Sequence, residues 1–162
     1  MLDPKGENGR LCQAAGVEPV RIQPGGAVRL NPLDPHVGGA NRPRDQVVQE
    51  QLSVLQAIIG ASLRRGLTPE ERVACELGLA QATSRADGEP TLKHVVAAML
   101  APSDDAARSV ATTAENLARG SREAALELRR LCEGDLKGMF DDRTSGSFDL
   151  SAPIVSLDMS AV

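Results

Sequence analysis

The chain has almost no aromatic residues: its 162 residues include two Phe and neither Tyr nor Trp. Proteins that bind single-stranded nucleic acid stack the bases on exposed aromatic rings, so this composition argues against that class. The formal net charge is −4, and non-specific DNA binding requires an excess of cationic contacts. We therefore find no direct nucleic-acid signal, and we expect a core of aliphatic side chains.

The chain also lacks the patterns of a metal site, a disulfide framework or a membrane protein. The three cysteines, Cys12, Cys75 and Cys132, include no pair at metal-ligand spacing, and their odd number argues against a disulfide framework. The two histidines, His36 and His94, have no cysteine pair near them. No apolar run approaches the ~18 residues of a membrane span, and the N-terminus has no signal-peptide core. The sequence predicts a cytoplasmic chain without a bound metal.

Residues 1–43 are rich in turns and contain six of the ten prolines. Between the turns, residues 17–22 and 27–30 are expected to be extended, and residues 9–15 are expected to form a short helix. The glycine pair Gly25-Gly26 is expected to form a turn rather than a phosphate cradle, since no helix follows it directly.

Residues 44–134 have the apolar periodicity of about five short amphipathic helices. The first includes residues 47–59 and ends at Gly66, the third begins at Thr91, and the fourth extends from residue 103 to 119. The positions expected to face inward are Val73, Leu77 and Ala80 in the second helix, Val95, Val96, Met99 and Leu100 in the third, and Ala125, Leu128, Leu131 and Cys132 in the fifth.

The start of the second helix has a strong sequence signature. Thr68 is expected to cap it, Pro69 suits the first helical position, and Glu71 completes a capping box.

Both ends of the chain have sequence patterns typical of β-strands. Residues 152–158 form an apolar run that ends at Asp158, and Leu2-Asp3 resembles the last residues of another strand. Neither strand has an evident partner nearby in sequence, so we expect the chain to be an internal fragment of a larger fold.

Four short segments follow one another in an order that resembles a known family. They are Asp3-Pro4-Lys5-Gly6-Glu7, Asn31-Pro32-Leu33-Asp34, the segment 134–141 (Gly-Asp-Leu-Lys-Gly-Met-Phe-Asp) and Leu157-Asp158-Met159-Ser160. Their order and spacing resemble the conjugative-transfer, or type IV secretion, ATPases, and more closely the actinobacterial ATP-binding members. The resemblance extends over essentially the whole chain.

The resemblance implies an α/β fragment of a RecA-like P-loop ATPase domain, with short strands at both ends flanking a mainly helical insertion of about five helices. Residues 1–43 would be a partial core, 44–134 the helical insertion, and 135–162 a loop and a returning core strand. The complete parent protein would bind ATP and Mg²⁺, form a homo-hexamer, and drive DNA or protein through a secretion channel. It would lie in the cytoplasm, at the inner face of the membrane through its channel partners.

The resemblance also suggests site residues. Asp3 and Glu7 would lie near the nucleotide, whereas Asn31, Asp34 and Asp158 belong to family motifs whose role is open. The alternative from the residues themselves is structural: Asp3 shapes a turn beside a solvated Glu7, and Asn31 and Asp34 cap local turns.

Both nucleotide-binding motifs of that ATPase class are absent from the sequence. The phosphate-binding loop ends in Gly-Lys-Ser/Thr, but the three lysines here follow Pro4, Leu92 and Leu136, and no Asp-Glu pair occurs to organise Mg²⁺ and water. We therefore expect the chain alone to bind no cofactor and to be inactive. The alternative is a self-contained helical interaction module without catalytic activity, which would melt cooperatively, whereas a fragment would have exposed strand edges and low stability.

Overall fold

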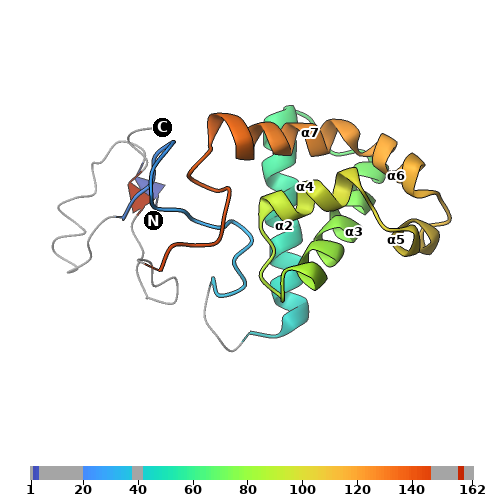
Figure 1. Ribbon diagram of the computed structural model, residues 1–162, viewed down its shortest axis with the longest axis horizontal. Coiled ribbons are helices and arrows are strands. Elements are labelled where there is room, and N and C mark those ends of the chain that lie inside the picture. Colours follow the sequence, from blue (N-terminus) through green and yellow to red (C-terminus); the bar gives the residue numbers. More distant parts are fainter. Residues whose placement is uncertain (1, 4–19, 38–41, 147–156, 159–162) are drawn as a thin grey trace.

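The computed structural model describes residues 2–3, 20–37, 42–146 and 157–158. Most of the described residues belong to a group of helices, and three short strands lie beyond two extended segments on one side of it (Figure 1). The helices are α2 (Arg44–Leu63), α3 (Pro69–Arg85), α4 (Leu92–Leu100), α5 (Asp104–Ser109), α6 (Ala114–Gly120) and α7 (Arg122–Arg130), followed by a π-helical segment η1 (Leu131–Asp135). None of the helices described is both long and apolar enough to span a membrane.

The strands β1 (Leu2–Asp3), β2 (Val20–Arg21) and β3 (Leu157–Asp158) have two residues each. They pair in parallel in the order β1-β3-β2, so the central strand comes from the far end of the chain. Leu157 lies opposite Leu2 on one side and Val20 on the other. The helix expected at 9–15 and most of the strand expected at 152–158 lie outside the described residues.

The expected α/β fold class, with strands flanking the helices, is wrong for the described structure, which is mainly helical. Strands of two residues are too short to present a face on which helices can pack. Residues 27–30, which were expected to be extended, do not belong to the sheet. There are six α-helices rather than about five in the described part, because the region expected as one helix over 103–119 is interrupted near Ala111, whose φ is 55°.

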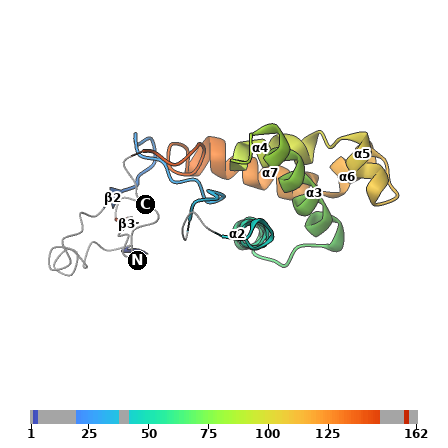
Figure 2. The same ribbon diagram turned by 90° about the horizontal axis from the view of Figure 1, so that it is seen from below.

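The apolar core lies between the helices. Figure 2 views α2 nearly end-on, to one side of the layer formed by α3, α4 and α7. Each of these helices contributes fully buried side chains, and Leu33 adds one from the segment before α2. The largest of the fully buried side chains in this cluster are Leu33, Leu55, Ile59, Leu79, Val95, Met99 and Leu128.

The face that α3 buries differs from the expected one by about one residue. Val73 and Leu77 are only half-buried and Ala80 is exposed, while Ala74, Cys75, Gly78, Leu79 and Ala82 are buried. The reason is a close approach to α4: a Cβ at Gly78 would lie 2.9 Å from Met99 Cγ. A residue without a side chain is therefore needed at this point of the α3–α4 contact, and Val73 and Leu77 are left half-buried.

The start of α3 confirms the capping-box prediction. Thr68 Oγ1 accepts a hydrogen bond from Glu71 N at 3.2 Å, and Thr68 N donates to Glu71 Oε2 at 2.8 Å. Glu71 is 2% exposed and also accepts two hydrogen bonds of 2.8 Å from the Arg65 guanidinium. This one carboxylate therefore fixes both the first turn of α3 and the connection from α2.

Stability is expected to fall in acid partly because of Glu71. The hydrogen bond from Arg65 lowers the pKa of Glu71 below its ordinary value of 4.5; burial opposes this shift, and the hydrogen bond from Thr68 N supports it. Since the folded-state pKa is depressed, the contribution is complete above about pH 4.5 and is lost as the pH falls through the lower folded value. Urea denaturation at pH 7 and pH 3.5 measures the loss, which should be smaller in Glu71→Gln. An equal loss in both proteins would contradict this assignment.

Candidate functional site

Two of the four sequence landmarks meet in the folded chain. We call residues 22–34 the first strap, residues 136–146 the second strap, and residues 44–135 the helical body. The straps are more than 100 residues apart in sequence but run together between the strands and the helices (Figure 1). The bonds that join them run from Gly25 N to Lys137 O (2.8 Å), Leu30 N to Met139 O (2.8 Å), Ser145 N to Arg29 O (2.9 Å) and Arg29 N to Ser145 Oγ (2.9 Å).

Glycine is required where the straps approach most closely. Gly138 has a φ of 85°, and a Cβ there would lie 3.0 Å from both Cα and N of Gly25. Gly25 itself has a φ of 72° and forms a turn. The glycine inside the 134–141 landmark is thus explained by backbone packing against the other strap.

Asn31 is buried, and its side-chain nitrogen and oxygen each have a hydrogen-bond partner within the chain. Its Nδ2 donates to the carbonyl of Pro90 at 2.9 Å, and its Oδ1 accepts from Leu33 N at 3.0 Å. Its backbone N–H donates to Thr144 Oγ1 at 3.1 Å. Asn31 therefore connects the first strap to the second strap and to the α3–α4 connection.

The other predicted site residues lie in two places. Asp34 is in the turn after Asn31, where its Oδ1 accepts from His36 N at 2.9 Å. Asp3 and Asp158 are opposite one another in the register of β1 and β3. Glu7 lies outside the described residues. A nucleotide-binding role for Asp3 and Glu7 remains a prediction, as does a functional role for the family-motif residues.

Sequence reasoning did not identify Asp141, the last residue of the 134–141 landmark, as a site residue. Its side chain is 5% exposed and accepts hydrogen bonds from Arg29 Nε (3.2 Å), Lys93 Nζ (3.0 Å) and Gly138 N (3.1 Å). Burial alone would raise the pKa of Asp141, but the hydrogen bond and charge of Lys93, with the charge of Arg29, outweigh it and hold the pKa below its ordinary value. Asp141 is therefore a buried, ionised carboxylate shared by three segments.

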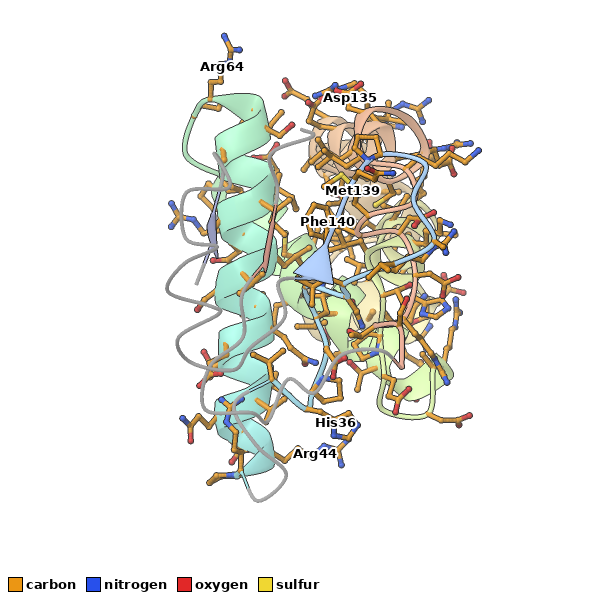
Figure 3. All side chains as sticks on the ribbon, turned by 90° about the vertical axis from the view of Figure 1, so that its left-hand side faces the viewer. His36, Arg44, Arg64, Asp135, Met139 and Phe140 are labelled. Carbon is orange, nitrogen blue, oxygen red and sulfur yellow. The ribbon has the colours of Figure 1, made fainter. Side chains whose placement is uncertain are left out.

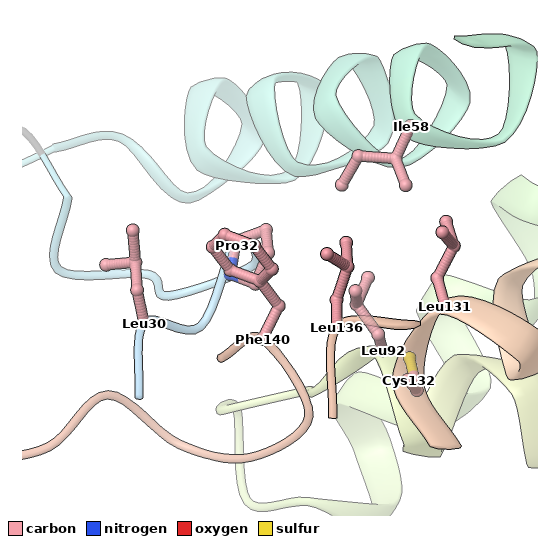
Figure 4. A pocket seen from close by; sticks show the side chains of 8 residues that line it. All are labelled: Leu30, Pro32, Ile58, Leu92, Leu131, Cys132, Leu136 and Phe140. Carbon is pink, nitrogen blue, oxygen red and sulfur yellow. The ribbon is translucent and has the colours of Figure 1, made fainter. Parts of the chain in front are cut away.

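An apolar cavity of about 310 Å³ lies between the straps and the helical body (Figure 4). Seen from the strap side, Met139 and Phe140 lie between α2 and the other helices (Figure 3). Burial raises the pKa of the Cys132 thiol in the cavity wall to about 11, so it is uncharged at neutral pH. The lining residues are Leu30, Pro32, Leu136 and Phe140 from the straps, and Ile58, Leu92, Leu131 and Cys132 from the helical body.

The described site has the chemistry of a junction between chain segments rather than of a catalytic centre. Both oxygens of Asp141 are occupied by cations of the chain itself, and every wall of the cavity is apolar. Within the part of the chain that the structure describes, no group of three or more His, Cys, Asp or Glu side chains is placed to hold a metal ion.

Comparison with known proteins shows a similarity of fold to a solved structure. No protein-family model matches the chain, and no curated protein matches it. Among solved structures it is similar to VirB4 of Thermoanaerobacter pseudethanolicus, with a TM-score of 0.61 and 20% sequence identity over 98% of this chain. The matched region is 60% of the VirB4 chain. The chain thus has the fold of a part of VirB4.

Proposed function

We propose that the chain is part of a motor protein of the conjugative-transfer, or type IV secretion, ATPase class. The observation that carries the proposal is the meeting of two landmarks, 31–34 and 134–141, in paired straps within a fold similar to VirB4. Sequence order and three-dimensional fold are separate lines of support.

The proposal extends to the ligands, assembly and location of the parent protein. The parent protein is an actinobacterial-type ATP-binding member of this class that binds ATP and Mg²⁺, assembles as a hexamer and couples hydrolysis to the translocation of DNA or protein. It acts in the cytoplasm, at the inner face of the membrane, through contacts with secretion-channel components. This chain has neither the Gly-Lys-Ser/Thr loop nor the Asp-Glu pair, so the proposal assigns hydrolysis to other segments of the parent.

Phosphate release tests the proposal in two proteins. The purified 162-residue chain is expected to show no Mg²⁺-dependent ATP turnover above about 1 per minute. A parent protein translated from the extended reading frame is expected to hydrolyse ATP and to lose that activity when its phosphate-binding lysine is replaced. Turnover by the short chain, or an extended frame without either motif, would overturn the proposal.

One observation favours the alternative of a helical interaction module. Leu55, Val95 and Leu128 are fully buried, so the helical body has a core of its own. Cooperative melting is therefore expected for both a fragment of a motor protein and a self-contained module, so it cannot distinguish the two hypotheses. The genomic reading frame distinguishes them, because stop codons on both sides of these 162 codons would favour the module.

A further inference from the structure

The first strap is anchored to the helical body at its end. Asn31 Nδ2 donates to Pro90 O at 2.9 Å, and Gln51 Nε2 of α2 donates to Leu33 O at 2.6 Å. Both bonds are buried, and the Leu33 side chain belongs to the core of the helical body. Buried, fully paired contacts of this kind are costly to break, so this end of the straps is fixed.

Two ion pairs connect side chains of the second strap to the helical body, and one of them involves a buried carboxylate. Asp141 accepts hydrogen bonds from Arg29 and Gly138, which both belong to the straps. Its contact with the body is Lys93 Nζ of α4 at 3.0 Å, and the Lys93 side chain is 47% exposed. The other pair, Arg143 Nη1 to Glu89 Oε2 at 3.2 Å, is exposed on both sides and so contributes little. Removing Lys93 would therefore free the second strap from α4 while leaving the carboxylate paired within the straps.

Between these contacts Phe140 packs against the core of the helical body, but a cavity remains beside it. Protein interiors are normally close-packed, with few voids larger than a water molecule. Here a cavity of about 310 Å³, partly open to solvent, lies between Leu136 and Phe140 of the second strap and Ile58 of α2 (Figure 4). Side chains that face a void lose dispersion contacts on that side. The straps are thus held over the cavity by the contacts at its edge.

The second strap leaves the body at a break in regular helix. The α-helix α7 passes into the π-helical segment η1, in which Gly134 has the non-helical angles φ −114° and ψ −106°. Isolated π-helical turns of this type are frequent at functional sites in helices. The helical hydrogen-bond pattern therefore does not extend rigidly into the strap.

We propose that the paired straps form a lid over the apolar cavity, and that the Lys93–Asp141 ion pair is the latch that holds the lid closed. The lid pivots at two points when it opens: its anchored end at Asn31 and the helix break at Gly134. Because the straps are bonded to each other, they move as one unit. Opening exposes Cys132 in the cavity wall, while Cys75 in the core of the helical body stays covered.

The rate of thiol modification tests the latch in the full-length chain carrying Cys12→Ser. Cys75 and Cys132 are both buried free thiols, so Cys75 serves as an internal control for unfolding. In Lys93→Met, the rate at which Cys132 reacts with Ellman's reagent is expected to rise about tenfold, with the Cys75 rate unchanged, as local opening requires. Lys93→Arg keeps a cation and is expected to restore the slow rate.

The effect of Lys93 on the pKa of Cys132 excludes one other explanation for faster labelling. Burial raises the pKa of Cys132 and the charge of Lys93 lowers it, so removal of Lys93 reduces the thiolate fraction. Faster labelling in Lys93→Met cannot then arise from a more acidic thiol. Arg119→Met, which removes an exposed pair with Glu115 in α6, is the matched control and should leave both rates unchanged. Equal acceleration of both thiols, or no acceleration of Cys132, would overturn the proposal.

Discussion

Replacement of Glu71 by Ala is expected to lower the free energy of unfolding by about 3 kcal/mol, the range found when one partner of a buried ion pair is removed. Glu71 is 2% exposed, and its two oxygens accept both hydrogen bonds from Arg65 and the one from Thr68 N. The substitution removes the capping box of α3 and leaves Thr68 N without its acceptor. The α2–α3 connection and the first turn of α3 should loosen together.

Glu123 provides a matched control for this effect. It accepts a hydrogen bond of 2.7 Å from the same Arg65 guanidinium, but its side chain is 69% exposed. Because exposed ion pairs contribute little, Glu123→Ala should cost only a small fraction of the Glu71→Ala effect. Urea denaturation followed by far-ultraviolet circular dichroism is the suitable measurement, since the chain has no Trp or Tyr for fluorescence. Similar costs for the two variants would show that burial is not the cause.

The helices were largely predictable because their signals are local. The capping box at Thr68 was predicted from four consecutive residues, and α2 and α4 from apolar spacing within one helix. The buried face of α3 was predicted incorrectly because large apolar residues were assumed to mark it. The contact between Gly78 and Met99 depends on the neighbouring helix, and no periodicity within α3 reports it.

The candidate site was predictable only in part, because its contacts join distant segments. Asn31 was identified from its motif, but its hydrogen bond to Pro90 spans 59 residues of sequence. The Arg29–Asp141 contact spans 112 residues, and nothing in the local pattern around Asp141 distinguishes it from a solvated carboxylate. The α/β expectation was wrong for a related reason: the apolar segments at the chain ends indicated strands, but strand length depends on partners that the sequence does not specify.

The close approach of the two straps makes Gly138 highly sensitive to substitution. Gly138→Ala is expected to destabilise the folded chain by about 3 kcal/mol, combining the cost of a positive φ with a backbone clash. The added Cβ would lie 3.0 Å from Gly25 Cα and N, and backbone atoms cannot turn aside as a flexible side chain can. The straps would have to separate, breaking the bond from Leu30 N to Met139 O.

Gly25→Ala is the control that separates the cost of the steric clash at Gly138 from the cost of placing a side chain at a positive φ. Gly25 also has a positive φ of 72°, but a Cβ there would have no atom within 4 Å, so only the conformational cost of about 1 kcal/mol is expected. Hydrogen exchange at the Leu30 amide then distinguishes two ways of disturbing the lid. Gly138→Ala should abolish protection of that amide because the straps part, whereas Lys93→Met should preserve it because they move together. Retained protection in Gly138→Ala would mean that the close approach of the two glycines does not hold the straps in register.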